Sequence, residues 1–321
     1  NSDLVINRLL NSNEPSVRYL AATGICGKDK NDPEVCQMRE DIRCSESVQT
    51  MLAGRLPDGK FPWHAYAKWR GAFWTLLLFA DMGYPPGDES LVPLRDQVLN
   101  WLLDESRLKR VPQIKGLFRR CALQEATAVL TMIKLEIIDP RIEQLIELLL
   151  KWQWPDGGWN CDKKTQASHS SFYETWLPLQ AMNAYACLTG DPKARSAVEK
   201  ASEVFLCRHL YKRLSNGEVM EDQFTKLAYP PYWHYDILVG LRVMNEIGKL
   251  DDPRCEDALD LLESKRQPDG GFVADIKYYR VTNRETSGVS TVGWGFVNGK
   301  KMNEFVTVRA LTVLKQAGRW N

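Results

Sequence analysis

The sequence predicts an all-α protein in which an inner ring of buried helices lies inside an outer ring of amphipathic helices. Apolar residues recur with helical spacing along almost the whole chain. A Pro-Asp-Gly turn recurs at 57–59, 155–157 and 268–270. An Asp-Pro pair recurs in step with it, at 32–33, 139–140, 191–192 and 252–253. Such an internal repeat indicates stacked helical hairpins, and we expect five to six of them.

The outer helices are expected to bury one face each. In the segment after Pro140, Ile142, Leu145, Ile146 and Leu149 fall on a single face. Similar helices are expected over 33–51, 90–104, 192–206 and 253–264. The Asp-Pro pairs fit their starts, because Asp caps free backbone N–H groups and Pro is tolerated at the first helical position.

The helices expected after the turns are apolar nearly all round, so they should be covered on every side. They are expected over 69–80, 122–135, 172–188, 235–247 and 305–314, and a sixth pair over 4–10 and 16–23. No long polar linker interrupts the chain, which predicts a single domain over 1–321. The stretch 273–302 is irregular, and loops as long as this one often cover a functional site.

Composition narrows the partners and the compartment. The net charge is +1, from 42 basic and 41 acidic residues, which argues against nucleic acid as a partner. No apolar run reaches the ~20 residues of a membrane span, and residues 1–3 do not begin a signal peptide. The 8 cysteines form no CxxC pair, which favours free thiols, no disulfide-linked partner and a cytoplasmic location. A zinc knuckle of Cys26, Cys36 and Cys44 is an alternative with untypical spacing.

The repeat carries a resemblance to a known superfamily. Gln/Trp-x-Pro-Asp-Gly-Gly followed by an aromatic residue and an apolar helix, at 153–159 and 267–272, resembles the repeat of squalene–hopene cyclases and protein prenyltransferase β-subunits. The resemblance covers nearly the whole chain and implies an α/α toroid. Segments 14–20, 159–162, 169–172 and 233–236 resemble bacterial single-toroid squalene-cyclase-like proteins more closely.

The chain departs from both chemistries of that superfamily. Terpene cyclases of this kind protonate an alkene with an Asp-x-Asp-Asp motif, which is missing here, although Asp236 stands at a comparable place. Prenyltransferases hold a catalytic zinc with an Asp, a Cys and a His, and they require a partner α-subunit. Residues 172–175 resemble the helix that carries their His, but Glu174 stands at that position.

Chemistry is expected where the inner helices begin, because these ends point at a central cavity. Three of the four histidines, His64, His169 and His234, lie at or just before such starts, where helix capping is the competing explanation. We expect an enzyme that acts on a terpenoid or isoprenyl substrate in this cavity. His234 and Asp236 would be its acid/base pair, assisted by Glu174 and His169.

The expected substrate-binding residues share the same rim. They are His64, Tyr66, Lys68, Trp69, Arg70, Arg120, Cys121, Glu125, Ser170, Tyr173, Trp233, Tyr235 and Glu304. The sequence requires no cofactor, but a divalent metal, zinc or magnesium, could be held by Cys161, His169, His234 and Asp236.

Two other functions fit the same pattern. Aromatic side chains stack on sugars as well as on carbocations, so a carbohydrate-directed hydrolase or lyase is an alternative. A non-catalytic scaffold that binds a ligand or a protein is the other. It predicts a filled cavity in which Glu174, His234 and Asp236 have fixed internal partners.

Overall fold

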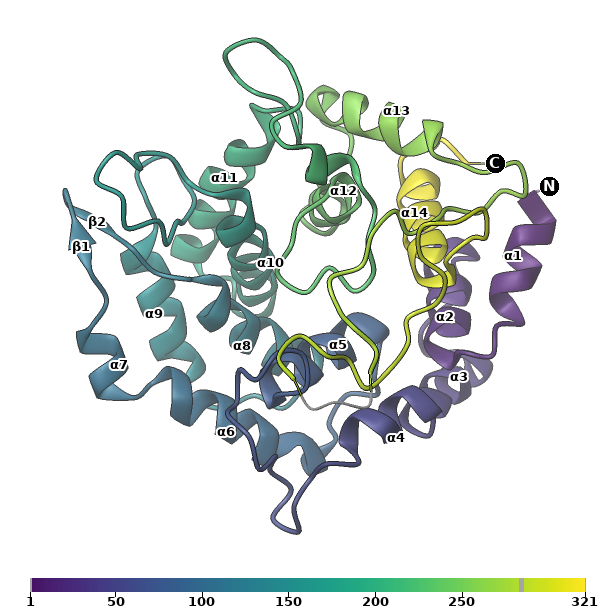
Figure 1. Ribbon diagram of the computed structural model, residues 1–321, viewed down its shortest axis with the longest axis horizontal. Coiled ribbons are helices and arrows are strands. Elements are labelled where there is room, and N and C mark those ends of the chain that lie inside the picture. The colour runs from purple at the N-terminus through teal and green to yellow at the C-terminus, as the bar shows by residue number, and fades with distance from the viewer. Residues whose placement is uncertain (1, 283–285, 321) are drawn as a thin grey trace.

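The computed structural model describes residues 2–282 and 286–320, and it is predominantly helical (Figure 1). This confirms the all-α class. The sheet of the described part is a short antiparallel hairpin of β1 (Gln113–Ile114) and β2 (Leu117–Phe118), which the sequence did not predict. None of the described helices combines the length and the apolar character that crossing a membrane requires.

The expected inner helices all form, with shifted ends. They are α2 (Pro15–Leu20), α5 (Ala72–Met82), α8 (Leu123–Lys134), α10 (Phe172–Thr189), α12 (Ile237–Glu246) and α14 (Glu304–Gln316). A π-helical turn, η1 (Ala21–Ile25), extends α2. Contacts pass from α5 to α8, then to α10, α12, α14 and α2, and from α2 back to α5. In Figure 1 these helices lie around the middle of the molecule.

The remaining helices lie farther out in Figure 1. They are α1 (Ser2–Leu10), α3 (Pro33–Arg43), α4 (Glu46–Leu52), α6 (Val92–Leu102), α7 (Glu105–Lys109), α9 (Ile142–Trp152), α11 (Pro192–Leu206) and α13 (Glu256–Ser264), with 3-10 turns η2 (Glu89–Leu91), η3 (Asp222–Thr225) and η4 (Pro253–Cys255). The single helix expected over 33–51 is wrong, because Ser45 starts a new helix by accepting a hydrogen bond from the Val48 N–H.

The recurring turns have the predicted geometry. Gly59, Gly157 and Gly270 adopt φ values of +82°, +104° and +88°, which favour glycine. At Gly157 a Cβ atom would collide with the carbonyl oxygen of Lys200 on α11. The Asp191 side chain caps α11 by accepting from the Ala194 N–H at 2.7 Å, as the Asp-Pro pattern predicts. The three turns precede three of the inner helices, α5, α10 and α14.

The irregular stretch 273–302 lies against the starts of inner helices, and its residues 283–285 fall outside the described part. The Gly288 N–H donates to the carbonyl of Lys68, just before α5. The Asp275 N–H donates to the carbonyl of Leu227, in the segment that leads to α12. Figure 1 shows this stretch crossing in front of the inner helices. It therefore covers one end of the helix assembly.

Candidate metal centre

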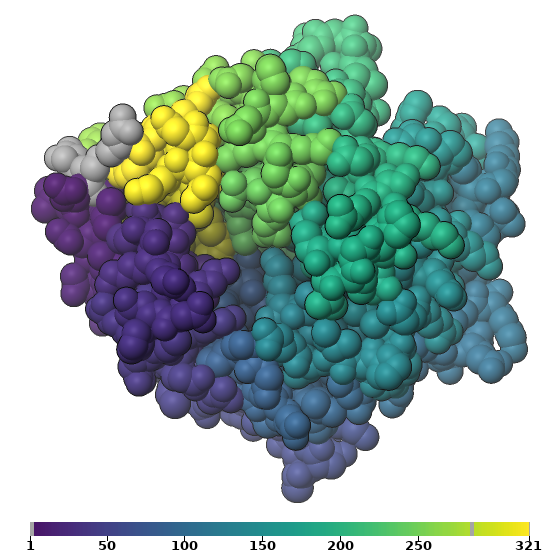
Figure 2. Space-filling model, turned by 180° about the vertical axis from the view of Figure 1, so that it is seen from behind, coloured from purple at the N-terminus to yellow at the C-terminus, as the bar shows by residue number. Residues whose placement is uncertain are grey.

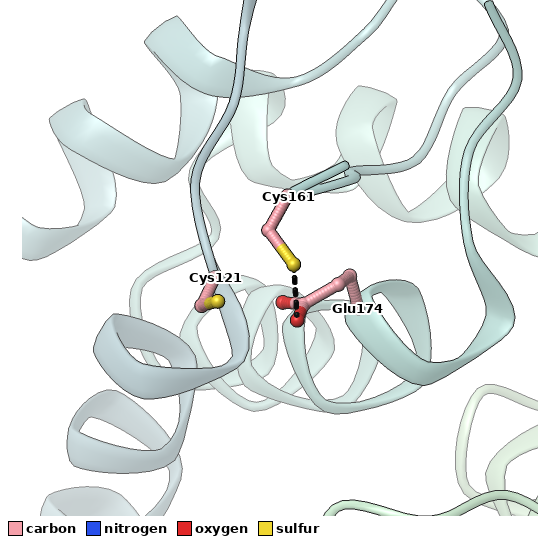
Figure 3. A group of neighbouring side chains, drawn as sticks. All are labelled: Cys121, Cys161 and Glu174. Atoms are coloured by element: carbon pink, nitrogen blue, oxygen red, sulfur yellow. Dashed lines mark hydrogen bonds between the residues drawn. The ribbon is translucent and has the colours of Figure 1, made fainter. Parts of the chain in front are cut away.

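Three possible metal ligands converge where α8 and α10 begin (Figure 3). Cys121 lies two residues before α8, Cys161 follows the turn at 155–157, and Glu174 is in the first turn of α10. One ligand atom from each, a Sγ or a carboxylate oxygen, lies within 4.8 Å of the others. The Cys161 Sγ is 3.3 Å from Glu174 Oε1. Among the described residues this is the group of three or more His, Cys, Asp and Glu side chains that could hold a metal ion.

Backbone hydrogen bonds bring the two cysteine segments together. The Trp159 N–H donates to Thr175 Oγ1 at 3.2 Å, and the Ser171 N–H donates to the Trp159 carbonyl at 2.9 Å. The Arg120 N–H donates to the carbonyl of Asn160 at 3.3 Å. The segment before Cys161 is therefore fixed to the start of α10, and the segment before Cys121 is fixed to it in turn.

The surroundings let the group carry negative charge on Cys161. The hydrogen bond from the Cys121 thiol, with help from Glu174, lowers the pKa of the Cys161 thiol to about 6 against the opposing effect of burial. The same bond and burial raise the pKa of Cys121. Burial and the Cys161 charge raise the pKa of Glu174 well above its usual range. The N-terminus of α8 faces Glu174, because the Leu123 N–H donates to Glu174 Oε2 at 3.5 Å.

A buried ion-pair cluster lies beside the group. Glu125 is fully buried, and its Oε1 accepts from Arg107 at 2.8 Å and from Arg120. Its Oε2 has no hydrogen-bond partner. Arg120 and Glu125, both expected at the site, thus pair with each other. The sequence did not predict Arg107 at the site, because no neighbouring residue in its basic segment distinguishes it from a solvent-exposed arginine.

Tyr66 adds a protonated phenol near the group. Burial, with a smaller electrostatic effect of the nearby Cys121, Glu174 and Cys161 side chains, raises the pKa of Tyr66 to about 12. Gln124, at the start of α8, hydrogen-bonds the phenol. Tyr66 therefore keeps its phenol O–H, a hydrogen-bond donor, within electrostatic reach of the three ligands.

His234 and Asp236 have separate environments. The His234 ring stacks between Trp233 and Tyr278, with centroids at 3.8 and 3.3 Å, and burial lowers its pKa to about 4. Asp236 is 2% exposed and caps α12 by accepting from the Val239 N–H at 2.9 Å. Burial raises the pKa of Asp236 to about 6. Within the described part of the chain no hydrogen bond or ion pair joins the two residues, so their acid/base pairing stays a prediction.

Several expected residues line one cleft on the covered side. Lys68, Trp69, Trp233 and His234 border a cleft of about 470 Å³ together with Tyr278. The Lys68 ammonium lies 5.2 Å from the Trp69 ring centroid and 5.6 Å from that of Trp233. The structure thus brings these four predicted residues together in an aromatic, cationic cleft.

The other two histidines predicted at the site, His169 and His64, are exposed to solvent. His169 is exposed, and its carbonyl accepts from the Asn160 side chain at 2.8 Å. His64 is exposed, and its Nδ1 accepts from the Tyr66 N–H at 3.0 Å. Both histidines therefore make hydrogen bonds within a turn, and these bonds are a structural explanation for their positions.

The other expected substrate-binding residues each contact another residue of the chain. Arg70 lies over the Trp63 ring, Ser170 bonds Asp156, Tyr173 bonds Glu221, Tyr235 bonds the Leu210 carbonyl, and Glu304 accepts from Ser12.

The group differs from the four residues that the sequence offered as possible metal ligands. Only Cys161 of the four candidates belongs to the group, because His169 is exposed, His234 is stacked between rings and Asp236 caps a helix. The alternative zinc knuckle does not form in the described residues either, since its cysteines are exposed and share no such group. All eight cysteines are free thiols, Cys26, Cys36 and Cys44 among them.

Comparison with protein-family models, with curated proteins and with solved structures found no match.

Proposed function

We propose that Cys121, Cys161 and Glu174 bind a zinc ion and that the chain is a zinc-dependent enzyme. The convergence of the three ligand atoms carries this proposal. Typical zinc bonds to sulfur and carboxylate oxygen would place these atoms ~3.5 Å apart in a tetrahedral site. The observed Cys161–Glu174 distance is 3.3 Å. Two thiolates favour zinc over magnesium, which prefers oxygen ligands.

The chain's own residues would prepare the site for chemistry. A zinc ion with three protein ligands has an open fourth position, where it can polarise a bound thiol, carbonyl or water. Glu125 pairs with Arg120, which is next to Cys121 in sequence and helps to fix that segment. Tyr66, with its pKa raised to about 12, keeps its phenol proton at neutral pH and can donate a hydrogen bond to a bound ligand.

The resemblance supports an isoprenyl or terpenoid substrate and an α/α toroid. Glu174 stands where the similar prenyltransferase helix carries its zinc-binding His, and it lies next to Cys161. The closed succession of helix contacts supports the toroid. An apolar pocket between the inner helices measures only about 40 Å³. That volume holds roughly one to three water molecules. We therefore place an isoprenyl chain in the aromatic cleft of about 470 Å³ that His234 and Lys68 border.

The first test is zinc binding by the full chain. We expect one zinc per chain by elemental analysis after dialysis. Cys121→Ser and Cys161→Ser should lose most of it, and Glu174→Gln should weaken it. Cys187→Ser is the matched control, because Cys187 is an exposed free thiol in the last turns of α10. Zinc retained equally by all four variants would contradict the proposal.

A non-catalytic scaffold is the alternative that one observation favours, namely the internal capping role of Asp236. The two functions differ in what metal removal does. A chelator should abolish turnover of an isoprenyl substrate if the zinc is catalytic. If the protein shows no turnover and the chelator only lowers its stability, the result would favour the scaffold.

A further inference from the structure

A funnel between the inner helices opens at the end opposite the metal centre. Its apolar tip of about 40 Å³ is bordered by Leu77, Leu130, Trp176 and Val239. A polar pocket of about 370 Å³ lies beside this tip and shares Arg242 with it, and we call the two pockets together the funnel, with the polar pocket as its mouth. Figure 2 shows the back of the molecule hollowed between the purple and yellow helices and the green and teal ones.

The funnel and the metal centre lie at opposite ends of the same helix. Cys121 precedes the start of α8, whereas Lys134, the last residue of α8, lines the tip. These two residues are roughly 20 Å apart along the helix axis, at about 1.5 Å per residue. The funnel is therefore a separate site.

Positive charge exceeds negative charge in the funnel lining. The charged side chains that line it are four cations and two carboxylates: Lys30, Lys134, Arg242, Arg309, Asp81 and Glu246. Lys30 is exposed, so the partly buried excess is that of Arg242, Arg309 and Lys134 over the two carboxylates. Such an excess is costly unless an anion neutralises it.

The two carboxylates are already occupied. Asp81 accepts from Arg242 at 2.6 Å and also from Arg309. Burial would raise the pKa of Asp81, but the two arginines outweigh it and hold the pKa well below its usual range. Glu246 accepts from Gln180 at 2.8 Å and lies 3.5 Å from the Lys134 ammonium. The two carboxylates are therefore shared among three cations, Arg242, Arg309 and Lys134.

Arg242 has donors to spare. In the described part of the chain only its Nη2 has a hydrogen-bond partner, and 23% of its side chain is exposed. Arg309, which is 6% exposed, has a buried Nε without a partner. A planar guanidinium with free N–H groups matches a carboxylate in two-pronged geometry.

We propose that the funnel binds a short-chain carboxylate. The carboxylate pairs with the free edge of Arg242, and a tail of two or three carbons fills the apolar tip beside Leu77 and Trp176. The tip admits a short tail only, and an anion without a tail would leave it unfilled. The proposal does not depend on the metal, and its test contains none.

The first experiment is calorimetric titration of the full chain with three probes. Butyrate should bind at one saturable site. Inorganic phosphate, which has the charge but no tail, should bind about tenfold or more weakly, and propylammonium, which has the opposite charge, should not bind. No butyrate binding would overturn the proposal, and so would equal binding of phosphate and butyrate.

Two variants locate the site. Arg242→Met removes the charge and should weaken butyrate binding by about tenfold or more, as expected for a charged hydrogen bond. Ala80→Leu fills the tip, because Ala80 lines it, and should abolish butyrate binding with no change in charge. It keeps the test decisive if Arg242→Met fails to fold. Arg195→Met, on the exposed face of α11, is the matched control. Unchanged binding in Ala80→Leu would overturn the proposal.

Discussion

Ionisation of the buried Asp236 should make the protein less stable as the pH rises. Burial raises its pKa from 3.8 to about 6, and the side chain is 2% exposed. The folded state therefore holds the proton more tightly than the unfolded chain does. Its stabilising contribution is complete below about pH 4 and is lost as the pH rises through about 6. A shift of about 2 pKa units corresponds to roughly 3 kcal/mol.

The variant that tests this is Asp236→Asn. An amide oxygen can still accept from the Val239 N–H, so the cap of α12 is retained while the ionisation is removed. The second carboxylate oxygen accepts from the Ala228 N–H at 3.2 Å, and its loss should cost the variant a constant amount at every pH. The slope with pH is therefore the informative quantity, not the absolute stability.

The assay is urea unfolding followed by circular dichroism at several pH values between 4 and 7. Relative to Asp236→Asn, the wild type should lose roughly 3 kcal/mol of unfolding free energy across this range. Asp251→Asn, at an exposed position, should follow the wild type throughout. Parallel curves for the wild type and Asp236→Asn, or a wild type that gains relative stability with rising pH, would refute the reasoning.

Two further substitutions test the packing around the site. Gly157→Ala should lower the unfolding free energy by roughly 2 kcal/mol or more, because it combines positive φ with a collision against Lys200. Gly217→Ala, which has positive φ but open space around it, should cost less, and equal losses in chemical denaturation would contradict the collision. Glu125→Gln leaves two arginines, each 13% exposed, without their carboxylate and should cost roughly 3 kcal/mol. An unchanged thermal midpoint would show that this ion-pair cluster does not stabilise the fold.

The helices were predictable because their signals are local. The positive φ of Gly157 and the Asp191 cap of α11 each follow from a few neighbouring residues. The hairpin at 113–118 was missed because strands of two residues show no periodicity. The break before α4 was missed because the apolar spacing continues past Ser45, whose capping bond ends one helix and starts another.

The site could be predicted only as separate residues. Cys121, Cys161 and Glu174 were all candidates, but in three different roles, because Cys121 comes from another repeat than Cys161 and Glu174 and their convergence depends on tertiary contacts. Asp81 and Arg242 were missed because the sequence pattern placed the cavity at the helix starts, whereas these two lie away from the starts of apolar helices. A charged residue within an otherwise apolar helix was the available signal.

Cobalt substitution tests the metal centre most directly, because the absorption spectrum of bound Co²⁺ depends on which side chains bind the ion. One equivalent of Co²⁺ added to the full chain should give a thiolate-to-cobalt charge-transfer absorption in the near ultraviolet. The band should weaken in Cys121→Ser and in Cys161→Ser and stay unchanged in Cys187→Ser. A wild-type spectrum without this band, or a band that survives both ligand substitutions, would contradict a metal centre at the start of α8 and α10.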